Sequence, residues 1–252
     1  MTNQTCKAAV LTKRHTIEVM DVQMPECGRD GMIIKLEAAS ICGTDLHLFE
    51  EDPAYPVILG HELCGRVVEM GPDAAKSMRC YTGEVKLGDR ICLYPWVVCG
   101  TCENCLTYGI GACGVCDNSF VYGVPYESLG FGGAPIRSNS IYEAPYIKGG
   151  FGEYMYVFPG TFMWQVPDDM PSNVASLLDP MAVAMRGVEL AMRAPGIFED
   201  SFNLGSTALV IGDGQIAALV ATIARTLGIQ HIIISGSPRR TYACSSSNET
   251  PV

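Results

Sequence analysis

The chain has 252 residues, 48% of them hydrophobic, a size that suits one large domain or two smaller ones with a sizeable core. The formal net charge of −10 argues against nucleic acid and anionic membranes as partners. The start, MTNQTCKAAVLTKR, has no signal-peptide core, and no later run is apolar enough to span a bilayer, so we expect a cytoplasmic protein.

Most of the first two thirds of the chain is predicted to form strands. Residues 7–22 resemble two strands joined by a polar turn, and residues 31–40, 62–71 and 87–95 place β-branched residues between glycines. Residues 120–148 are rich in Gly, Pro, Tyr and Ser and have little helical period. That segment is expected to be a long surface excursion.

The pattern changes after a return of strand character at residues 149–167. Residues 171–194 carry apolar side chains at helical spacing, with Ser172 or Asn173 as the candidate N-cap. From residue 206 the pattern is strand, helix, strand, which is one βαβ unit of a parallel sheet. The final residues, 241–252, are polar and without period, so we expect them to be disordered.

Five of the twelve cysteines lie close together, from Cys99 to Cys116. In a chain without a signal peptide, such cysteines favour metal binding or reduced thiols over disulfides. Cys99, Cys102, Cys105 and Cys113 follow the pattern C-x2-C-x2-C-x7-C, which predicts a closed, tetrahedral structural zinc site. Four free thiols or an iron–sulfur cluster are the alternatives, and Cys116 receives no role.

Two further motifs, ICGTDLH at residues 41–47 and GHELCG at residues 60–65, place a cysteine and a histidine beside glycine at expected strand ends. Alone, either residue is usually just packed in a core. Together with the cysteine cluster downstream, they resemble the zinc-dependent alcohol dehydrogenases of the medium-chain dehydrogenase/reductase superfamily. The glycines around His61 fit that family's zinc signature, and the resemblance covers about residues 7 to 240.

The resemblance implies an α/β fold with a β-rich part. A GroES-like, β-barrel-type catalytic domain is expected over residues 1–180, with the structural zinc lobe at residues 97–116. A connecting helix and a partial Rossmann domain, doubly wound, are expected over residues 181–240. A complete Rossmann domain needs about six strands. Two are recognisable here, so we expect a C-terminally truncated member of the family.

The same resemblance implies a ligand set for a catalytic zinc. Cys42 and His61 match the family's first two ligands, and Glu62 matches an outer or exchangeable ligand. Asp179 stands at the position of the third ligand, where relatives have Cys or Glu. Aspartate is one methylene shorter than glutamate, so direct binding by Glu62 is an open alternative. Asp179 would then only cap or kink a helix at Pro180.

Three further residues take roles from the resemblance. Asp45 matches the carboxylate that orients the ligand histidine, Thr44 the hydroxyl that contacts the substrate oxygen, and His47 the outer end of a proton relay. The implied chemistry is hydride transfer between an alcohol or its carbonyl product and NAD(P), with zinc polarising the substrate oxygen. Trp96 could line the substrate pocket or simply pack.

A glycine turn follows the first strand of the βαβ unit. Gly212 is expected to make the tight turn, and Gly214 to let the backbone approach a pyrophosphate at the helix N-terminus. Ala217 takes the third position, which governs helix–strand packing. Asp213, inside the turn, adds an unfavourable negative charge.

The second strand of this unit is not followed by the acidic residue that binds the adenosine ribose in NAD enzymes. Gly236 and Ser237 come there instead, followed by Arg239 and Arg240. This favours NADP over NAD, although the arginines could also be solvated surface charges.

The expected function is therefore a zinc-dependent oxidoreductase with two zinc ions per chain and a small-molecule alcohol or carbonyl substrate. No nucleic-acid or membrane partner is expected, and the homo-oligomer typical of the family is a weaker expectation for a truncated chain. The alternatives are a zinc-binding fragment without catalysis, completed by a partner chain, and a zinc module that binds protein or nucleic acid. The substrate itself is not readable.

Overall fold

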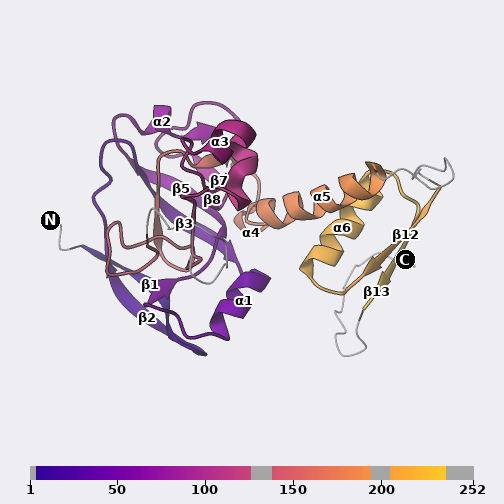
Figure 1. Ribbon diagram of the computed structural model, residues 1–252, viewed down its shortest axis with the longest axis horizontal. Helices are drawn as coiled ribbons and strands as arrows, with labels where there is room; N and C mark the ends of the chain where they lie inside the picture. The colour runs from indigo at the N-terminus through magenta and orange to yellow at the C-terminus, as the bar shows by residue number, and fades with distance from the viewer. Residues whose placement is uncertain (1–3, 126–137, 194–204, 237–252) are drawn as a thin grey trace. The chain divides into compact units, whose positions relative to one another are not determined.

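The computed structural model describes residues 4–125, 138–193 and 205–236 (Figure 1). The chain divides into two compact units, Met1–Asp179 and Pro180–Val252, which we describe separately. In the described residues, no helix has both the length and the apolar character needed to cross a membrane. The expected disordered tail, 241–252, lies outside the described residues, as do Ser237, Arg239 and Arg240.

The first unit is mostly antiparallel sheet. Its strands are β1 (Thr5–Lys13), β2 (Thr16–Gln23), β3 (Met32–Ser40), β4 (Val57–Ile58), β5 (Glu62–Met70), β6 (Arg79–Cys80), β7 (Arg90–Leu93), β8 (Trp96–Val97), β9 (Phe120–Val121), β10 (Tyr154–Val157) and β11 (Phe162–Gln165). A six-stranded sheet has the order β10-β3-β5-β7-β11-β6, and β2-β1-β4 and β8-β9 form smaller sheets. In the described part of the six-stranded sheet, β11 and β6 pair in parallel and the other neighbouring strands are antiparallel.

Short helices connect these strands. They are α1 (Gly43–Phe49), α2 (Ala74–Ser77), α3 (Glu103–Tyr108), a 3₁₀ helix (Gly109–Gly114) and α4 (Ser172–Ala175). The main core forms where strands alternate, as in β1, or are apolar throughout, as at the start of β3. Burying these apolar faces supplies the main stabilising term of the unit.

The segment after Phe120 departs from the predicted surface excursion. Phe120, Tyr122 and Lys148 are almost completely buried. Tyr122 and Phe158 pack against Phe120 with ring centroids 5.2 and 5.0 Å away. The prediction was wrong for the described flanks, 120–125 and 138–148, because their aromatic and apolar side chains enter the core. Residues 126–137 lie outside the described residues.

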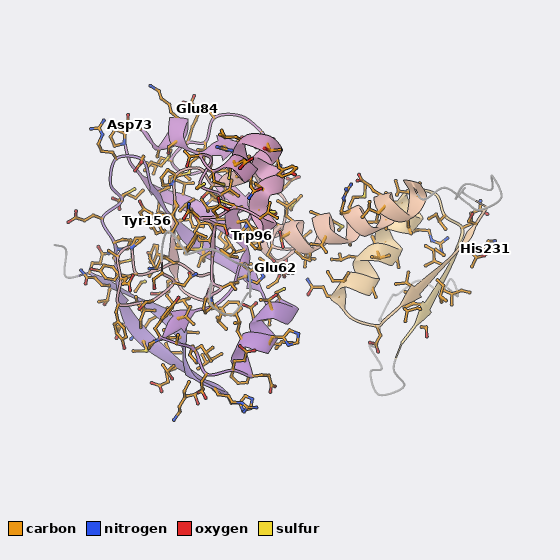
Figure 2. The ribbon with its side chains drawn as sticks, viewed as in Figure 1. Glu62, Asp73, Glu84, Trp96, Tyr156 and His231 are labelled. Carbon is orange, nitrogen blue, oxygen red and sulfur yellow. The ribbon has the colours of Figure 1, made fainter. Side chains whose placement is uncertain are left out.

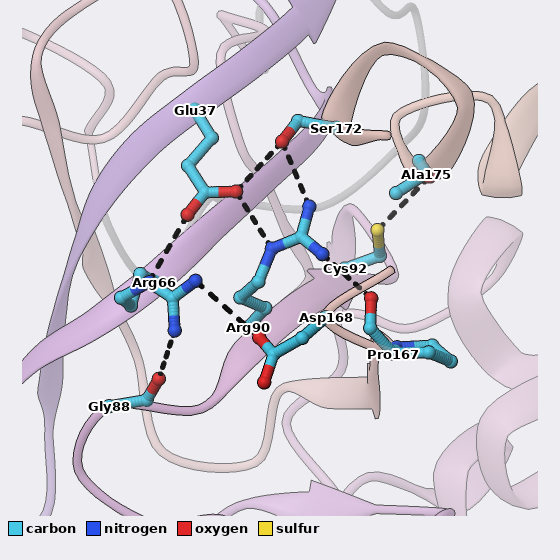
Figure 3. Close-up of polar contacts among 9 residues, drawn as sticks. All are labelled: Glu37, Arg66, Gly88, Arg90, Cys92, Pro167, Asp168, Ser172 and Ala175. Carbon is cyan, nitrogen blue, oxygen red and sulfur yellow. Dashed lines mark hydrogen bonds and ion pairs between the residues drawn. The ribbon is translucent and has the colours of Figure 1, made fainter. Parts of the chain in front are cut away.

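A buried arginine ties the strands of the large sheet to α4 (Figure 3). Nε of Arg90 donates to Oε2 of Glu37 on β3 at 2.9 Å, and its Nη2 donates to Oγ of Ser172 at 2.9 Å. Ser172 donates in turn to the same Glu37 oxygen at 2.8 Å. Arg90 also donates to the carbonyl of Pro167 at 2.7 Å, and Arg66 lies 3.3 Å from the other Glu37 oxygen. Ser172 is therefore committed to the sheet, and the N-cap of α4 is Pro171.

Glu37 makes this contact network sensitive to acid. Burial by itself raises the pKa of Glu37. Hydrogen bonds from Ser172 and Arg90 and the charges of Arg90 and Arg66 lower it by more, so the net pKa is below the ordinary value of 4.5. A carboxyl whose pKa is lowered by folding stabilises the protein above its unfolded pKa. That stabilisation is lost as the pH falls through the lower, folded value.

We therefore expect Glu37→Gln to lower the free energy of unfolding by about 1–3 kcal/mol at neutral pH, since it removes charged hydrogen bonds to a buried arginine. The deficit should shrink in acid, as the pH falls through the lowered pKa of Glu37 and the wild-type carboxyl becomes protonated. Urea denaturation at neutral and at acidic pH measures it, with Glu84→Gln, at an exposed glutamate, as the control. A deficit of equal size at both pH values would contradict the assignment.

The second unit holds the βαβ arrangement. Helix α5 (Leu178–Arg193) leads into it, followed by β12 (Thr207–Ile211), α6 (Gln215–Thr226) and β13 (His231–Ser235). β12 and β13 pair in parallel, and a small apolar cluster joins α5 to α6 through Ala184, Val188, Leu219 and Ile223. The continuous helix predicted over residues 171–194 is instead two helices, α4 and α5, separated by a turn at residues 176–177.

Candidate metal centres and nucleotide turn

Cys42 lies at the N-terminus of α1, two residues after the end of β3. Its backbone N–H donates to Oδ2 of Asp45 at 2.8 Å, and the other Asp45 oxygen accepts the N–H of Gly60 at 3.1 Å. Asp45 is 3% exposed, so these two bonds are made in the interior. One carboxylate therefore joins the helix that carries Cys42 to the residue that precedes His61.

His61 and Glu62 come next, at the start of β5 (Figure 2 labels Glu62). Gly60 has φ +90°, a left-handed backbone that glycine adopts readily. Both side chains are buried, and Cys42, His61 and Glu62 bring one donor atom each to within 4.8 Å of one another. The structure thus brings together three of the four residues predicted for the catalytic zinc.

An unsatisfied carboxylate atom fits a metal ion at this group. Oε2 of Glu62 is buried without a hydrogen-bond partner. Nδ1 of His61 lies 3.8 Å from the nearer Asp45 oxygen, which faces this side of the imidazole ring. Buried polar atoms left unpaired are costly. A thiolate, an imidazole and a carboxylate are all zinc ligands. An ion held by Cys42, His61 and Glu62 would have a ligand set that leaves a further position open.

The charges around this group also call for a cation. Burial raises the pKa of Glu62, and the positive charge of His61 only partly opposes it. For His61, burial lowers the pKa, but a hydrogen bond with Cys42 and the charge of Asp45 raise it more, so the net shift is upward. The upward pKa shifts of Glu62 and His61 both favour the protonated forms of these groups. A divalent ion would replace those protons.

Asp179 lies alongside this group but is not one of the three residues that converge. It stands in the first turn of α5 and is half-buried. Burial raises the pKa of Asp179, and the charge of His61 opposes the rise. The charge of Asp179 in turn contributes to raising the pKa of Glu62. The structure therefore places Glu62 within the ligand group and Asp179 at its edge.

The predicted proton-relay residues lie on α1. Oγ1 of Thr44 is 3.7 Å from Sγ of Cys42, so its hydroxyl borders the metal group. His47, one turn further along, is exposed. Trp96 on β8 is half-buried and packs against the apolar cluster that contains Leu48 and Val57 (Figure 2).

The cysteine lobe differs from the prediction in its fourth member. Cys99, Cys102, Cys105 and Cys116 bring their sulfurs within 4.8 Å of one another. Sγ of Cys99 is 3.8 Å from Sγ of Cys105, and Sγ of Cys102 is 4.0 Å from Sγ of Cys116. Four sulfurs at such separations fit a closed tetrahedral zinc site.

Cys113 lies outside this group because of the path of the chain. It sits near the end of the 3₁₀ helix, and its sulfur accepts a hydrogen bond from the hydroxyl of Tyr94 at 3.1 Å. The chain then turns back, with the N–H of Cys116 donating to the carbonyl of Ala112 at 2.7 Å. The spacing in the sequence predicts Cys113 as the fourth ligand and no role for Cys116. The structure instead brings Cys116 into the group and leaves Cys113 outside it. Spacing could not decide between them, since Cys113 and Cys116 themselves form a C-x2-C pair.

One sulfur of the lobe is prepared as a thiolate. Burial raises the pKa of Cys99, but the N–H groups of Thr101 and Cys102 donate to its sulfur and lower the pKa to about 6. In Cys105, burial raises the pKa to about 12. Metal binding requires thiolates, so an ion bound here would have to displace the proton of Cys105.

The glycine turn lies between β12 and α6, at the position where the sequence predicts a dinucleotide site. Gly212 has φ +129°, and its N–H donates to the carbonyl of Ser235 at 2.7 Å. Gly214 is the N-cap of α6, and Ala217 is buried against the turn. A Cβ placed on Gly236 would come within 2.6 Å of Cβ of Asp213, so Asp213 lies against the end of β13.

Comparison with known proteins agrees with this architecture. The alcohol dehydrogenase GroES-like domain matches residues 28–168. L-threonine 3-dehydrogenase of Idiomarina loihiensis is 29% identical over 244 residues, covering 89% of this chain and 56% of the relative. The enzyme of the same name from Francisella tularensis is 31% identical over 224 residues, covering 86% of this chain and 51% of the relative.

Solved structures give the same result. An alcohol dehydrogenase from Thermotoga maritima superposes with a TM-score of 0.71 at 25% identity, covering 94% of this chain and 59% of that one. A protein described as a zinc-binding dehydrogenase from Sinorhizobium meliloti, bound to NADP, superposes with a TM-score of 0.65 at 30% identity, covering 92% and 56%. The chain spans about half the length of the curated relatives it matches. It belongs to the alcohol dehydrogenase GroES-like family, as a zinc-type member of the medium-chain dehydrogenase/reductase superfamily.

Proposed function

We propose that this chain carries the metal centre of a zinc-dependent dehydrogenase that transfers hydride between an alcohol, or its carbonyl product, and NAD(P). The observation that carries the proposal is the buried group of Cys42, His61 and Glu62, in which one carboxylate oxygen of Glu62 has no hydrogen-bond partner. Relatives named as dehydrogenases support it.

Different residues of the chain have different roles in this proposal: metal binding, orientation of a ligand and proton transfer. Cys42, His61 and Glu62 would hold the catalytic zinc, and Asp45 orients His61. When bound, zinc supplies Lewis-acid polarisation of a substrate oxygen. The Thr44 hydroxyl, beside Cys42, is placed to accept the proton of an alcohol, and the exposed His47 to pass it to solvent.

Gly212 and Gly214 would receive a dinucleotide. When bound, its nicotinamide supplies the hydride acceptor. α6 begins directly after Gly214, and backbone N–H groups at a helix N-terminus are suited to binding a pyrophosphate. NADP is the proposed cofactor, since no acidic residue comes directly after β13, and Arg239 and Arg240 follow within five residues. The NADP bound to the Sinorhizobium meliloti protein is in line with this choice.

Hydride transfer is tested with the zinc-loaded chain, a nicotinamide cofactor and a panel that includes L-threonine, simple alcohols and polyols. We expect alcohol-dependent reduction of NADP that is lost in Cys42→Ala. Thr44→Val should lower kcat roughly 100- to 10,000-fold, the range for a positioned proton-transfer group, while Thr44→Ser retains the hydroxyl and most of the rate. Turnover that survives Cys42→Ala would contradict the proposal.

A second candidate is a zinc-binding module that is completed by another polypeptide and has no turnover of its own. The observation in its favour is the exposure of Leu209, Ile211 and Ile233 on the two described strands of the second unit, at 61%, 83% and 55%. Exposed apolar strand residues favour pairing or association. Two zinc ions per chain without any alcohol-dependent reduction of NAD or NADP would support this candidate.

A further inference from the structure

Three elements that carry or lead to candidate metal ligands lie together: β3 and β5 pair in the large sheet, and α4 contacts both strands. β3 ends at Ser40, two residues before Cys42, and β5 begins at Glu62. α4 ends four residues before Asp179. The relative placement of these three segments therefore decides which carboxylates can reach a metal ion beside His61.

The first attachment of α4 to the sheet is the contact of Ser172 with Glu37 and Arg90 (Figure 3). The side chain of Arg90 is 4% exposed and that of Glu37 is 25% exposed. Their ion pair is 2.9 Å long, and Ser172 bonds to both partners at 2.9 and 2.8 Å. A charged pair that is shielded from water and shared with one hydroxyl fixes that hydroxyl firmly.

The second attachment lies at the other end of α4. Oγ of Ser176 is 3.0 Å from Oγ of Ser40, and Ser176 is 3% exposed. Sγ of Cys92 donates to the carbonyl of Ala175 at 3.0 Å. Ser172 and Ser176 are therefore both held to β3. This strand ends two residues before Cys42. We call Glu37, Arg90, Ser172, Ser40 and Ser176 the α4 anchor.

The α4 anchor matters for Asp179 because the aspartate side chain is short. A longer carboxylate could reach an ion from a range of backbone positions, but aspartate needs its backbone placed within narrower limits. Asp179 comes only three residues after Ser176, in the first turn of α5. The backbone of Asp179 therefore follows wherever Ser176 is held.

We infer that the α4 anchor positions Asp179 beside His61 and Glu62 so that its carboxylate contributes to metal binding. The inference rests on the proposed metal function of that group. None of the α4 anchor residues touches the metal in this assignment. They act through Asp179, as positioning residues.

The test compares the full chain with Ser172→Ala/Ser176→Ala, with Asp179→Asn, and with all three changes together. Zinc affinity at the Cys42 site is measured by chelator competition, and Co²⁺ absorption reports the coordination of the same site. The four-cysteine lobe serves as an internal reference in each sample. Ser77→Ala is the matched control, because Ser77 holds the helix α2 and lies outside the α4 anchor.

We expect the double serine variant to bind zinc at the Cys42 site roughly 10-fold more weakly, as for outer residues that orient a ligand, with an altered Co²⁺ spectrum. Adding it to Asp179→Asn should cause no further loss, because residues acting through one group are not additive. Ser172→Thr, tested alone, keeps the hydroxyl and should retain wild-type affinity, which separates positioning from loss of fold.

Unchanged zinc affinity in the double serine variant would overturn the inference while leaving the proposed function intact. A full additional loss on top of Asp179→Asn would do the same, since the serines would then act independently of Asp179. A wild-type chain that binds no metal at the Cys42 site would overturn both the inference and the proposed function.

Discussion

Replacing Cys116 by serine is expected to cost the chain one zinc ion, whereas replacing Cys113 is expected to leave the zinc content unchanged. The sulfur of Cys116 lies within 4.8 Å of those of Cys99, Cys102 and Cys105. The sulfur of Cys113 instead accepts a hydrogen bond from Tyr94. Losing a direct ligand should weaken binding well beyond the roughly 10- to 100-fold typical of an outer residue.

The loss should also destabilise the lobe, because metal binding to such a site is coupled to its folding. Zinc content by mass spectrometry under native conditions, together with proteolytic sensitivity of residues 99–116, measures both effects. Cys113→Ser is the matched control, since it removes a thiol from the same lobe. Zinc lost from Cys113→Ser and retained by Cys116→Ser would mean that the pattern C-x2-C-x2-C-x7-C had identified the fourth ligand correctly.

The second large effect is expected for Asp45→Ala. This change leaves the buried N–H groups of Cys42 and Gly60 without acceptors, at roughly 1–3 kcal/mol each. It also frees the ring of His61, whose Nδ1 lies 3.8 Å from the carboxylate. Zinc affinity at the Cys42 site should fall roughly 10- to 100-fold, as for other carboxylates that orient a ligand histidine.

Thermal unfolding and chelator competition measure the two consequences of Asp45→Ala separately. Asp45→Asn is the graded control, because its amide oxygen can still accept one of the two N–H bonds. We expect Asp45→Asn to fall between wild type and Asp45→Ala in both measurements. An Asp45→Ala chain with wild-type zinc affinity would show that this carboxylate does not orient His61.

The metal centre was predictable from the sequence because its residues are local and their neighbours constrain them. Gly60 supplies the left-handed turn before His61, and Asp45 lies three residues after Cys42, where it can accept that residue's N–H. The choice of carboxylate was left open by the sequence. In the structure Glu62 converges with Cys42 and His61, and Asp179 interacts with His61 from the edge of that group.

The features that the sequence did not predict, the fourth cysteine of the lobe and the contacts of α4, also have physical explanations. Cys113 and Cys116 have the same side-chain chemistry and lie three residues apart, and the path of the chain after the 3₁₀ helix brings Cys116 into the group. In the α4 anchor, Glu37 bonds to Arg90, which is 53 positions away, and to Ser172, which is 135 positions away. A local sequence pattern cannot predict contacts over such separations. The same long-range contacts hold α4 against the sheet on the N-terminal side of the turn that separates it from α5.

The most direct test of the central claim, two separate metal sites on one chain, is the zinc content of wild type, His61→Ala and Cys99→Ser. We predict two zinc ions in the wild type and one in each variant. Cobalt substitution should show a thiolate-rich spectrum in His61→Ala and a mixed-ligand spectrum in Cys99→Ser. A wild-type chain with a single zinc ion, retained in His61→Ala and lost in Cys99→Ser, would contradict the assignment of Cys42, His61 and Glu62 as a metal centre.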